Sequence, residues 1–287
     1  MIEYIRGMFM SNNECNEKSC EGCSKENCPS HQKIEKLKVN PGTKIKHTIA
    51  VISGKGGVGK SLVTSLLAKE LHEAGHKVAI MDADITGPSI PKAFGAKDKA
   101  MGDETGIYAI KSKGGIPLMS VNCLLEDESD PIVWRGPLIA NLVTQLYSNV
   151  IYGEVEYLLI DMPPGTGDVP LTVFQQIPVD GAVVVSTPQD LVSLIVEKSV
   201  KMGKQMNVPL LGVVTNMAYV DCPHCEEKIY LYGKPKTEEV AKEFGLRNLD
   251  EIGIDPLLAA KVDAGDIESY EKHVLPKAVE LLENLDK

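Results

Sequence analysis

The feature that most constrains this chain is a glycine-rich octapeptide, Gly54-Lys55-Gly56-Gly57-Val58-Gly59-Lys60-Ser61. Before it, Thr48–Ser53 is a short apolar run with β-branched residues, which predicts a strand. After it, Lys60–Ala74 has the amphipathic spacing of a helix, and Gly75 is expected to end that helix. A strand, a glycine loop and a helix in this order predict a phosphate-binding loop, because the backbone N–H groups can surround phosphate oxygens.

Two side chains at the end of this loop have the chemistry that nucleotide binding needs. Lys60 is expected to reach the β- and γ-phosphates, and the Ser61 hydroxyl is expected to bind Mg²⁺. The loop therefore predicts ATP and Mg²⁺ as ligands. The loop residues expected to bind the nucleotide are Gly54, Lys55, Gly56, Gly57, Val58, Gly59, Lys60 and Ser61.

The alternation of apolar runs and amphipathic segments continues along the chain. Further strands are expected at Lys77–Met81, Glu156–Ile160, Gly181–Ser186 and Leu210–Thr215, and helices at Asp168–Ile177, Asp190–Gln205 and Pro276–Leu285. Continuous Val, Ile and Leu runs are typical of strands covered on both faces. We therefore predict an α/β fold with a doubly wound, mostly parallel sheet of the P-loop NTPase type. Residues 96–135 are expected to carry a hairpin, and residues 221–235 to form an insertion.

The N-terminal segment has a different composition. Residues 11–46 are polar and cysteine-rich, with too few apolar residues to fold unaided. We divide the chain into a tail of residues 1–46, expected to bind a metal or cluster, and a P-loop domain of residues 47–287. The tail cysteines could supply four thiolates to one iron–sulfur cluster, and zinc is the alternative. These cysteines are Cys15, Cys20, Cys23 and Cys28.

Charge and hydropathy exclude several kinds of partner. The net charge of −10 argues against broad binding to nucleic acid or anionic membranes. No apolar run approaches the roughly 18 residues of a membrane span. The first residues lack the cleavage site of a secretory signal. We expect a cytoplasmic protein that uses neither nucleic acid nor membrane as a partner.

Three carboxylates follow predicted strands. Asp82 and Asp84 come directly after the strand Lys77–Met81, and Asp161 ends the strand Glu156–Ile160. Because the carboxyl ends of parallel strands face the ligand crevice, these acids can approach the γ-phosphate and Mg²⁺. Asp161 is expected to be the Walker B partner of the metal, and the Pro/Gly-rich residues after it a switch. Helix capping and turn formation are the alternatives, and Asp168 is expected to be a helix cap.

Cys222-Pro223-His224-Cys225 is a second cysteine motif, placed in the predicted insertion. Such a pair is ambiguous among half a zinc site, a redox pair and a pair of cluster ligands. Two thiolates leave a four-ligand site half filled. A two-fold dimer would supply four thiolates to one 4Fe–4S cluster, with Cys222 and Cys225 from each copy.

The early lysine makes the octapeptide more specific. With Lys55 in place, the loop resembles the deviant Walker A loop of the MinD/nitrogenase-iron-protein ATPase class. That resemblance implies a nucleotide-sandwich homodimer in which Lys55 reaches the partner's nucleotide, much as an arginine finger would. It also implies that Asp84 positions or activates the attacking water and that Asp82 supports Mg²⁺ through water. Asn216 would hydrogen-bond the adenine edge.

Taken together, the motifs resemble the Mrp/ApbC family of iron–sulfur carrier ATPases, from about Lys46 to the C-terminus. The segments that carry the resemblance are the octapeptide, Asp84–Ser89, Trp134–Pro137, Asp161–Asp168 and Cys222–Cys225. The family implies an ATP-hydrolysing carrier that holds a labile 4Fe–4S cluster at the homodimer interface and transfers it to apo iron–sulfur proteins. Eukaryotic-type members carry a comparable N-terminal cluster segment, with a longer gap before the position of Cys20.

Other functions remain as alternatives. A MinD-like positioning or regulatory ATPase with structural zinc would need a basic amphipathic C-terminal helix for membrane binding. The chain instead ends in Glu280–Lys287, an acidic segment. A nitrogenase-iron-protein-like reductase would have widely separated cluster cysteines instead of the closely spaced Cys222 and Cys225. A zinc-stabilised ATPase without a cluster is the third alternative.

Overall fold

The structure is a computed structural model that describes residues 35–84, 87, 89–124, 136–165, 167–188, 192–225 and 227–286. The chain divides into two units, Met1–Glu35 and Lys36–Lys287, and the fold below is that of the second unit. Some residues of the predicted motifs lie outside the described residues. These are Cys15, Cys20, Cys23, Cys28, Ile85, Thr86, Pro88, Trp134, Arg135 and Thr166.

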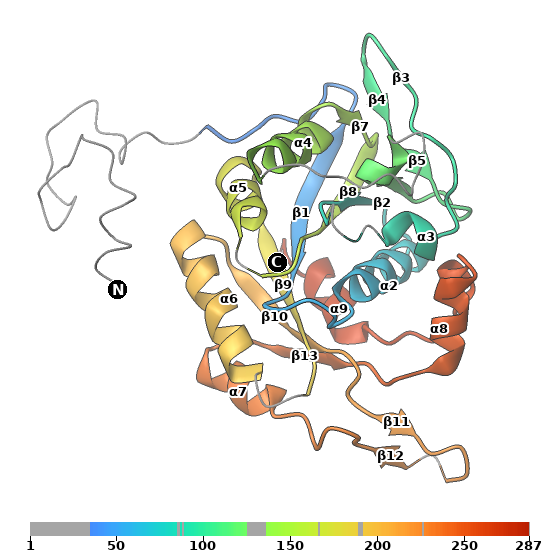
Figure 1. Cartoon of the computed structure of the whole chain (residues 1–287), viewed down its shortest axis with the longest axis vertical. Helices are drawn as coiled ribbons and strands as arrows, with labels where there is room; N and C mark the ends of the chain where they lie inside the picture. Colours follow the sequence, from blue (N-terminus) through green and yellow to red (C-terminus); the bar gives the residue numbers. More distant parts are fainter. Residues whose placement is uncertain are drawn as a thin grey trace, which may run out of the picture. The chain divides into compact units, whose positions relative to one another are not determined.

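An eight-stranded sheet forms the centre of this unit, in the order β13-β10-β9-β1-β8-β2-β6-β5 (Figure 1). All neighbouring strands are parallel except β5 and β6, which are antiparallel. The predicted α/β class with a mostly parallel sheet is confirmed. The strands are β1 (Lys44–Ile52), β2 (Val78–Asp82), β5 (Ile110–Lys111), β6 (Pro117–Met119), β8 (Glu154–Asp161), β9 (Gly181–Ser186), β10 (Leu210–Thr215) and β13 (Asn248–Glu251).

Helices cover both faces of the sheet (Figure 1). On one side lie α4 (Gly136–Ser148), α5 (Asp168–Gln176), α6 (Val192–Met206) and α7 (Thr237–Glu243). On the other lie α2 (Lys60–Glu73), α3 (Ile90–Ala93), α8 (Pro256–Asp263) and α9 (Pro276–Glu283). The described part of the chain also contains the short 3-10 helices η2 (Val121–Cys123) and η3 (Ile267–Ser269). No helix within the described ranges is long and apolar enough to cross a membrane.

The central strands are buried on both faces, as their continuous apolar sequences predict. All six residues of β9 are buried, and Leu158, Leu159 and Ile160 of β8 have no exposed surface. Burial of this apolar area is the main stabilising term of the fold. Because these strands are parallel, the polar residues that follow them lie at one edge of the sheet.

Some predicted strands agree with the structure to the residue, and others differ at their ends. The bounds of β9 and β10 are as predicted, whereas β1 begins at Lys44, before the predicted Thr48. The first residues of β1 alternate in exposure and pair with Glu154 and its neighbours on β8, so they lack a continuous apolar run. Helix α5 begins at Asp168 itself with Gly167 in the N-cap position, so the prediction that Asp168 caps this helix is wrong.

Outside the main sheet, the described residues form two small antiparallel hairpins. The first joins β3 (Gly102–Asp103) to β4 (Gly106–Tyr108), and β4 also pairs with β7 (Val150–Ile151). The hairpin expected within residues 96–135 is therefore present. The second joins β11 (Val220–Asp221) to β12 (Lys228–Ile229) and carries the second cysteine motif on the connection between them (Figure 1).

Candidate functional site

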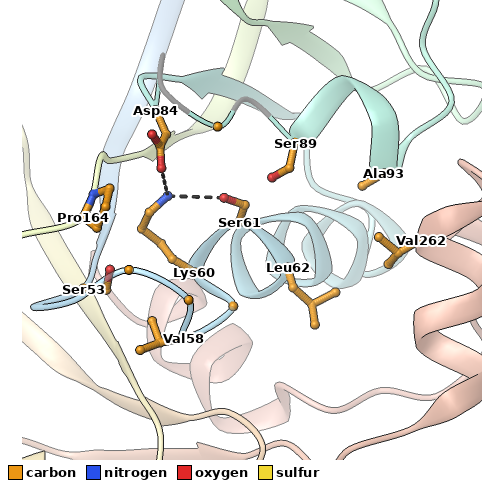
Figure 2. Close-up of a pocket in the computed structure, with 14 residues that line it drawn as sticks. Ser53, Val58, Lys60, Ser61, Leu62, Asp84, Ser89, Ala93, Pro164 and Val262 are labelled. Atoms are coloured by element: carbon orange, nitrogen blue, oxygen red, sulfur yellow. Dashed lines mark hydrogen bonds and ion pairs between the residues drawn. The ribbon is translucent and has the colours of Figure 1, made fainter.

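A cavity of about 340 Å³ opens at the start of α2, beside the ends of β1, β2 and β8. Figure 2 shows its lining, with Lys60 directed between Asp84 and Ser61. The side chains come from segments far apart in sequence because the parallel strands end at the same edge of the sheet. The lining consists of Ser53, Gly56, Gly57, Val58, Gly59, Lys60, Ser61, Leu62, Asp84, Gly87, Ser89, Ala93, Pro164 and Val262.

Two glycines of the loop adopt left-handed backbone angles that favour glycine. Gly57 has φ 78° and Gly59 has φ 80°, and Gly59 is the N-cap residue of α2. A Cβ atom at Gly59 would lie 2.1 Å from Nδ2 of Asn216, whereas one at Gly57 would meet no atom within 4 Å. The loop therefore requires glycine at position 59 for both conformation and space.

Lys60 lies at the centre of a buried cluster of charges. Its Nζ atom is 2.7 Å from Oδ1 of Asp161 and 3.6 Å from Oδ2 of Asp84. It also donates a hydrogen bond of 3.3 Å to Oγ of Ser61. The predicted loop lysine and two of the predicted carboxylates thus meet in the folded chain, although they come from α2, the end of β8 and the segment after β2.

Asp161 accepts hydrogen bonds on both carboxylate oxygens. Ser61 Oγ donates to Oδ2 at 2.6 Å, and Thr64 Oγ1 donates to Oδ1 at 2.8 Å. Asp161 has no exposed surface, so these donors and Lys60 together compensate for the burial of its charge. Thr64 is not among the site residues predicted from the sequence. Its position three residues after Ser61, on the same helix face, is the signal that could have identified it.

Asp82 is buried beside this cluster with one oxygen unused. Its Oδ1 accepts from the backbone N–H of Asp84 at 3.1 Å, while its buried Oδ2 has no hydrogen-bond partner among the described residues. Burial, followed by repulsion from the Asp161 carboxylate, raises the pKa of Asp82 well above its ordinary value. The Ser53 hydroxyl, at the cavity wall, is also buried without a partner in the described part of the chain.

Oδ2 of Asp82 and the Ser53 hydroxyl oxygen, which lack hydrogen-bond partners among the described residues, are hard oxygen donors of the kind that Mg²⁺ prefers. One lysine faces three carboxylates in the cluster, so a divalent cation would reduce the excess negative charge. The glycine-rich loop lines the cavity with backbone groups that can surround phosphates, and the hydroxyl of Ser61 adds another oxygen for Mg²⁺. The residues present therefore fit a Mg²⁺-nucleotide.

Asn216 contacts the phosphate loop but does not line the cavity. Its Nδ2 donates to the backbone oxygen of Val58 at 2.9 Å, and its own N–H donates to Ser186 at 2.8 Å. Lys55 and Gly54 are half-buried and likewise do not line the cavity. The structure thus separates these three residues from the group that surrounds the cavity.

The segment after Asp161 is bonded to the end of β1. The N–H of Gly165 donates to the backbone oxygen of Ser53 at 2.8 Å, and that of Met162 to Val51 at 3.1 Å. Gly165 has φ 85°, a conformation that suits glycine. These bonds hold the segment predicted to be a switch against the strand that leads into the phosphate loop.

The second cysteine motif lies away from the cavity, on the hairpin of β11 and β12. Cys222 is half-buried and Cys225 is exposed. Hydrogen bonds from the backbone N–H groups of His224 and Cys225, and from the Cys225 thiol, lower the pKa of Cys222. Cys123, predicted to be a small core residue, is buried. Across the described ranges, no three His, Cys, Asp or Glu side chains gather in a way that could hold a metal ion by themselves, so the Mg²⁺ site described above depends on hydroxyl oxygens as well.

The parallel sheet and the loop with its lysine–carboxylate cluster define a P-loop NTPase. A sequence model of the ParA family, described as NUBPL iron-transfer P-loop NTPase, matches residues 44–285. The chain belongs to this family, which confirms the resemblance to iron–sulfur carrier ATPases.

Two curated relatives of similar length share the same name. The chain is 44% identical over 263 residues to a protein of Clostridium perfringens named iron-sulfur cluster carrier protein, covering 89% of this chain and 92% of the relative. It is also 44% identical over 250 residues to a protein of the same name from Methanocaldococcus jannaschii, covering 84% and 86% of the two chains.

Solved structures show the same fold. A nucleotide-binding protein from Archaeoglobus fulgidus in complex with ADP is 45% identical, with a TM-score of 0.72 over 80% of this chain and 90% of that one. The MinC:MinD cell division protein complex of Aquifex aeolicus contains a chain 19% identical, with a TM-score of 0.58 over 84% and 95% of the two chains. At that identity the likeness concerns the fold alone.

Proposed function

We propose that this protein is an ATP-hydrolysing iron–sulfur cluster carrier. The observation that carries the proposal is the presence, in one chain, of a nucleotide loop with a buried Lys60 cluster and a separate hairpin that presents Cys222 and Cys225. The relatives named as carriers support it over the MinD-like alternative. The MinD structures share too little sequence to support a positioning role.

In the nucleotide site, the chain's own residues bind and orient ATP. The backbone N–H groups of the loop and the start of α2 contact the phosphates. Lys60, now paired with Asp161, would exchange this contact for the β- and γ-phosphates, and the Ser61 hydroxyl would be a ligand of Mg²⁺. Asp161 and, through water, Asp82 would hold Mg²⁺, which would supply charge neutralisation at the phosphates when bound. Asp84, at the cavity wall, positions the attacking water.

Two further residues act at the periphery of this site. Lys55, outside the lining of its own cavity, reaches the nucleotide of a second copy in a homodimer and stabilises transition-state charge there. Asn216 accepts from the adenine edge through its side-chain carbonyl, while its Nδ2 atom supports Val58. Hydrolysis controls the loading or release of the cluster.

The cluster is the cargo of this protein. Cys222 and Cys225 of two copies supply four thiolates to one 4Fe–4S cluster, which passes to apo iron–sulfur proteins. The lowered pKa of Cys222 favours the thiolate that binds iron. The four cysteines of the tail, which lie outside the described residues, would hold a second cluster within one chain.

Anaerobic reconstitution with iron and sulfide tests the proposal. The wild-type protein should show thiolate-to-iron absorbance together with bound iron and sulfide. A Cys222→Ala/Cys225→Ala double variant should lose one cluster per dimer and keep ATP binding. Cys123→Ala is the matched control, because this thiol is buried away from the hairpin. Stoichiometric zinc without sulfide in the wild type would refute the carrier function.

A further inference from the structure

Tyr219 lies at the base of the cysteine hairpin, where it leads into one strand and its ring contacts the side of the other. It directly precedes β11 in sequence, three residues before Cys222. On its ring, Nζ of Lys228 lies 3.7 Å from the centroid, and the ring of Tyr230 packs edge-on at 6.4 Å. Both contacts come from the β12 side of the hairpin, so one aromatic ring holds the two strands together at their base.

The same residue is attached to the main sheet. The N–H of Ile254 donates to the backbone oxygen of Tyr219 at 2.7 Å. A Cβ atom at Gly253 would lie 2.7 Å from Cε2 of Tyr219, so the ring packs directly on the backbone of the segment after β13. The hairpin is therefore anchored at Tyr219, whereas its tip, with Cys225, is exposed (Figure 1).

A short, bonded path leads from Tyr219 back to the phosphate loop. Asn216, three residues earlier, donates to the backbone oxygen of Val58 within that loop. Between them, Met217 has a positive φ of 56°, and the N–H of Ala218 donates to Ile252 at 2.8 Å. Every residue from 216 to 219 is thus constrained by hydrogen bonding, packing or backbone conformation, which leaves little freedom to absorb a movement of Val58.

We propose that Tyr219 is a positioning residue that transmits the state of the nucleotide loop to the Cys222 and Cys225 thiols. This inference rests on the proposed function of the loop and the cysteine pair. When nucleotide binding moves Val58, Asn216 moves with it, and the anchored Tyr219 ring passes the displacement to both hairpin strands. Such coupling requires that the nucleotide favour one arrangement of the hairpin over another.

The thiols themselves report this coupling without any cluster. The full-length, reduced, cluster-free protein is alkylated with iodoacetamide, with and without saturating Mg-ATP, and the peptide containing Cys222 and Cys225 is quantified by mass spectrometry. Mg-ATP should change the wild-type alkylation rate by about fivefold or more. In Tyr219→Ala, with nucleotide binding confirmed by equilibrium dialysis, the ratio should be close to one. Cys123 is the internal reference, since alkylation of this buried thiol reports unfolding.

Two more variants separate positioning from folding. Tyr219→Phe keeps the ring and should behave as the wild type. Gly253→Ala keeps the Tyr219 residue but displaces its ring, because the added Cβ atom would lie 2.7 Å from Cε2. It should also bring the ratio of alkylation rates with and without Mg-ATP closer to one. A wild-type ratio of one, or an unchanged ratio in Tyr219→Ala, would overturn the inference. If the thiols respond to Mg-ATP but wild type never binds sulfide, the carrier function fails and the positioning role of Tyr219 stands.

Discussion

Nζ of Lys60 lies 2.7 Å from Oδ1 of Asp161, and neither side chain is more than 5% exposed. This ion pair joins the first turn of α2 to the last residue of β8. Two buried charges stabilise a fold only as a pair, because either one alone would lack compensation for lost hydration. The contact therefore holds the nucleotide loop against the sheet. In the proposed function, a phosphate group replaces the carboxylate when ATP binds.

The Asp161→Asn substitution should destabilise the protein by about 3 kcal/mol, because among the described residues it leaves the buried Lys60 ammonium with Asp84, at 3.6 Å, as its remaining salt-bridge partner. Urea denaturation monitored by circular dichroism measures the loss. Thr64→Val is a milder companion variant. It removes one hydrogen bond to Asp161 and should cost about 1 kcal/mol. Equal stability of Asp161→Asn and wild type would contradict the role assigned to the pair.

Asp82→Asn should have the opposite effect from Asp161→Asn. The pKa of Asp82 is raised in the folded state, so folding binds protons and stability falls as pH rises from the ordinary value of 3.8 through the raised pKa. Removing this charge should leave the protein at pH 7 as stable as wild type or more so. The stability advantage of the variant over wild type should shrink as pH falls toward 4. Denaturation curves recorded between pH 4 and pH 7 would measure this change. A loss at pH 7 as large as that in Asp161→Asn would be inconsistent with this assignment.

Two loop glycines provide a matched pair of substitutions. Gly57→Ala incurs only the strain of a positive φ, about 1 kcal/mol. Gly59→Ala incurs that strain and a clash with Asn216, so its melting temperature should fall further. Thermal unfolding without nucleotide makes the comparison independent of binding. Gly245→Ala, with φ 70° and no atom within 4 Å of the added Cβ, is the control outside the loop. Equal losses in Gly57→Ala and Gly59→Ala would show that the loop shifts to accommodate the methyl group.

Mixed dimers test whether Lys55 acts in trans. Lys55→Ala and Asp84→Asn should each bind ATP and fail to hydrolyse it. In a heterodimer of the two, one site combines an intact Asp84 with an intact Lys55 from the other copy. Mixing equal amounts should restore about a quarter of wild-type turnover, because half the dimers are mixed and each has one complete site. Phosphate release measures the recovery, and recovery near zero would exclude the trans arrangement.

His76 predicts a pH-dependent contribution to stability. Its ring nitrogens lie 3.0 Å from Oε2 of Glu156 and 3.0 Å from Oε1 of Glu283, so the imidazolium form donates to both carboxylates. The hydrogen bond with Glu283, followed by that with Glu156, raises the pKa of His76 above 6.5. Its contribution is therefore complete below 6.5 and is lost as pH rises through the raised pKa. The same contact lowers the pKa of Glu156 from 4.5, so the contribution also declines as pH falls below that value.

The stability difference between wild type and His76→Gln should thus be largest near pH 5.5, about 1 kcal/mol or less at this partly exposed site. It should shrink toward pH 9. Urea denaturation at both pH values measures it, and Glu283→Gln should remove part of the same stabilisation. A double variant should lose less than the sum of the two single losses, because the residues form one contact. A difference independent of pH would rule out the ion pair as its source.

The elements that could be predicted are those whose signal is local. Continuous apolar runs identified β9 and β10 to the residue, since a strand covered on both faces needs apolar residues throughout. The start of β1 was missed because Lys44 belongs to the strand only by pairing with Glu154, a residue far along the chain. Thr64 was missed for a similar reason, because its partner Asp161 becomes adjacent only in the folded sheet.

The octapeptide by itself determined the P-loop class, because glycine angles, helix start and lysine are encoded in consecutive residues. Lys60 could be proposed from the octapeptide, and Asp84 and Asp161 from their places at the ends of strands. Only the tertiary structure decided that Lys60 lies closer to Asp161 than to Asp84 and that Asp82 keeps an oxygen without a hydrogen-bond partner among the described residues. It also decided that Asn216 donates a hydrogen bond to the backbone of Val58. These relations depend on distances between separate strands, and on the burial that sets the cost of each charge, neither of which a linear pattern contains.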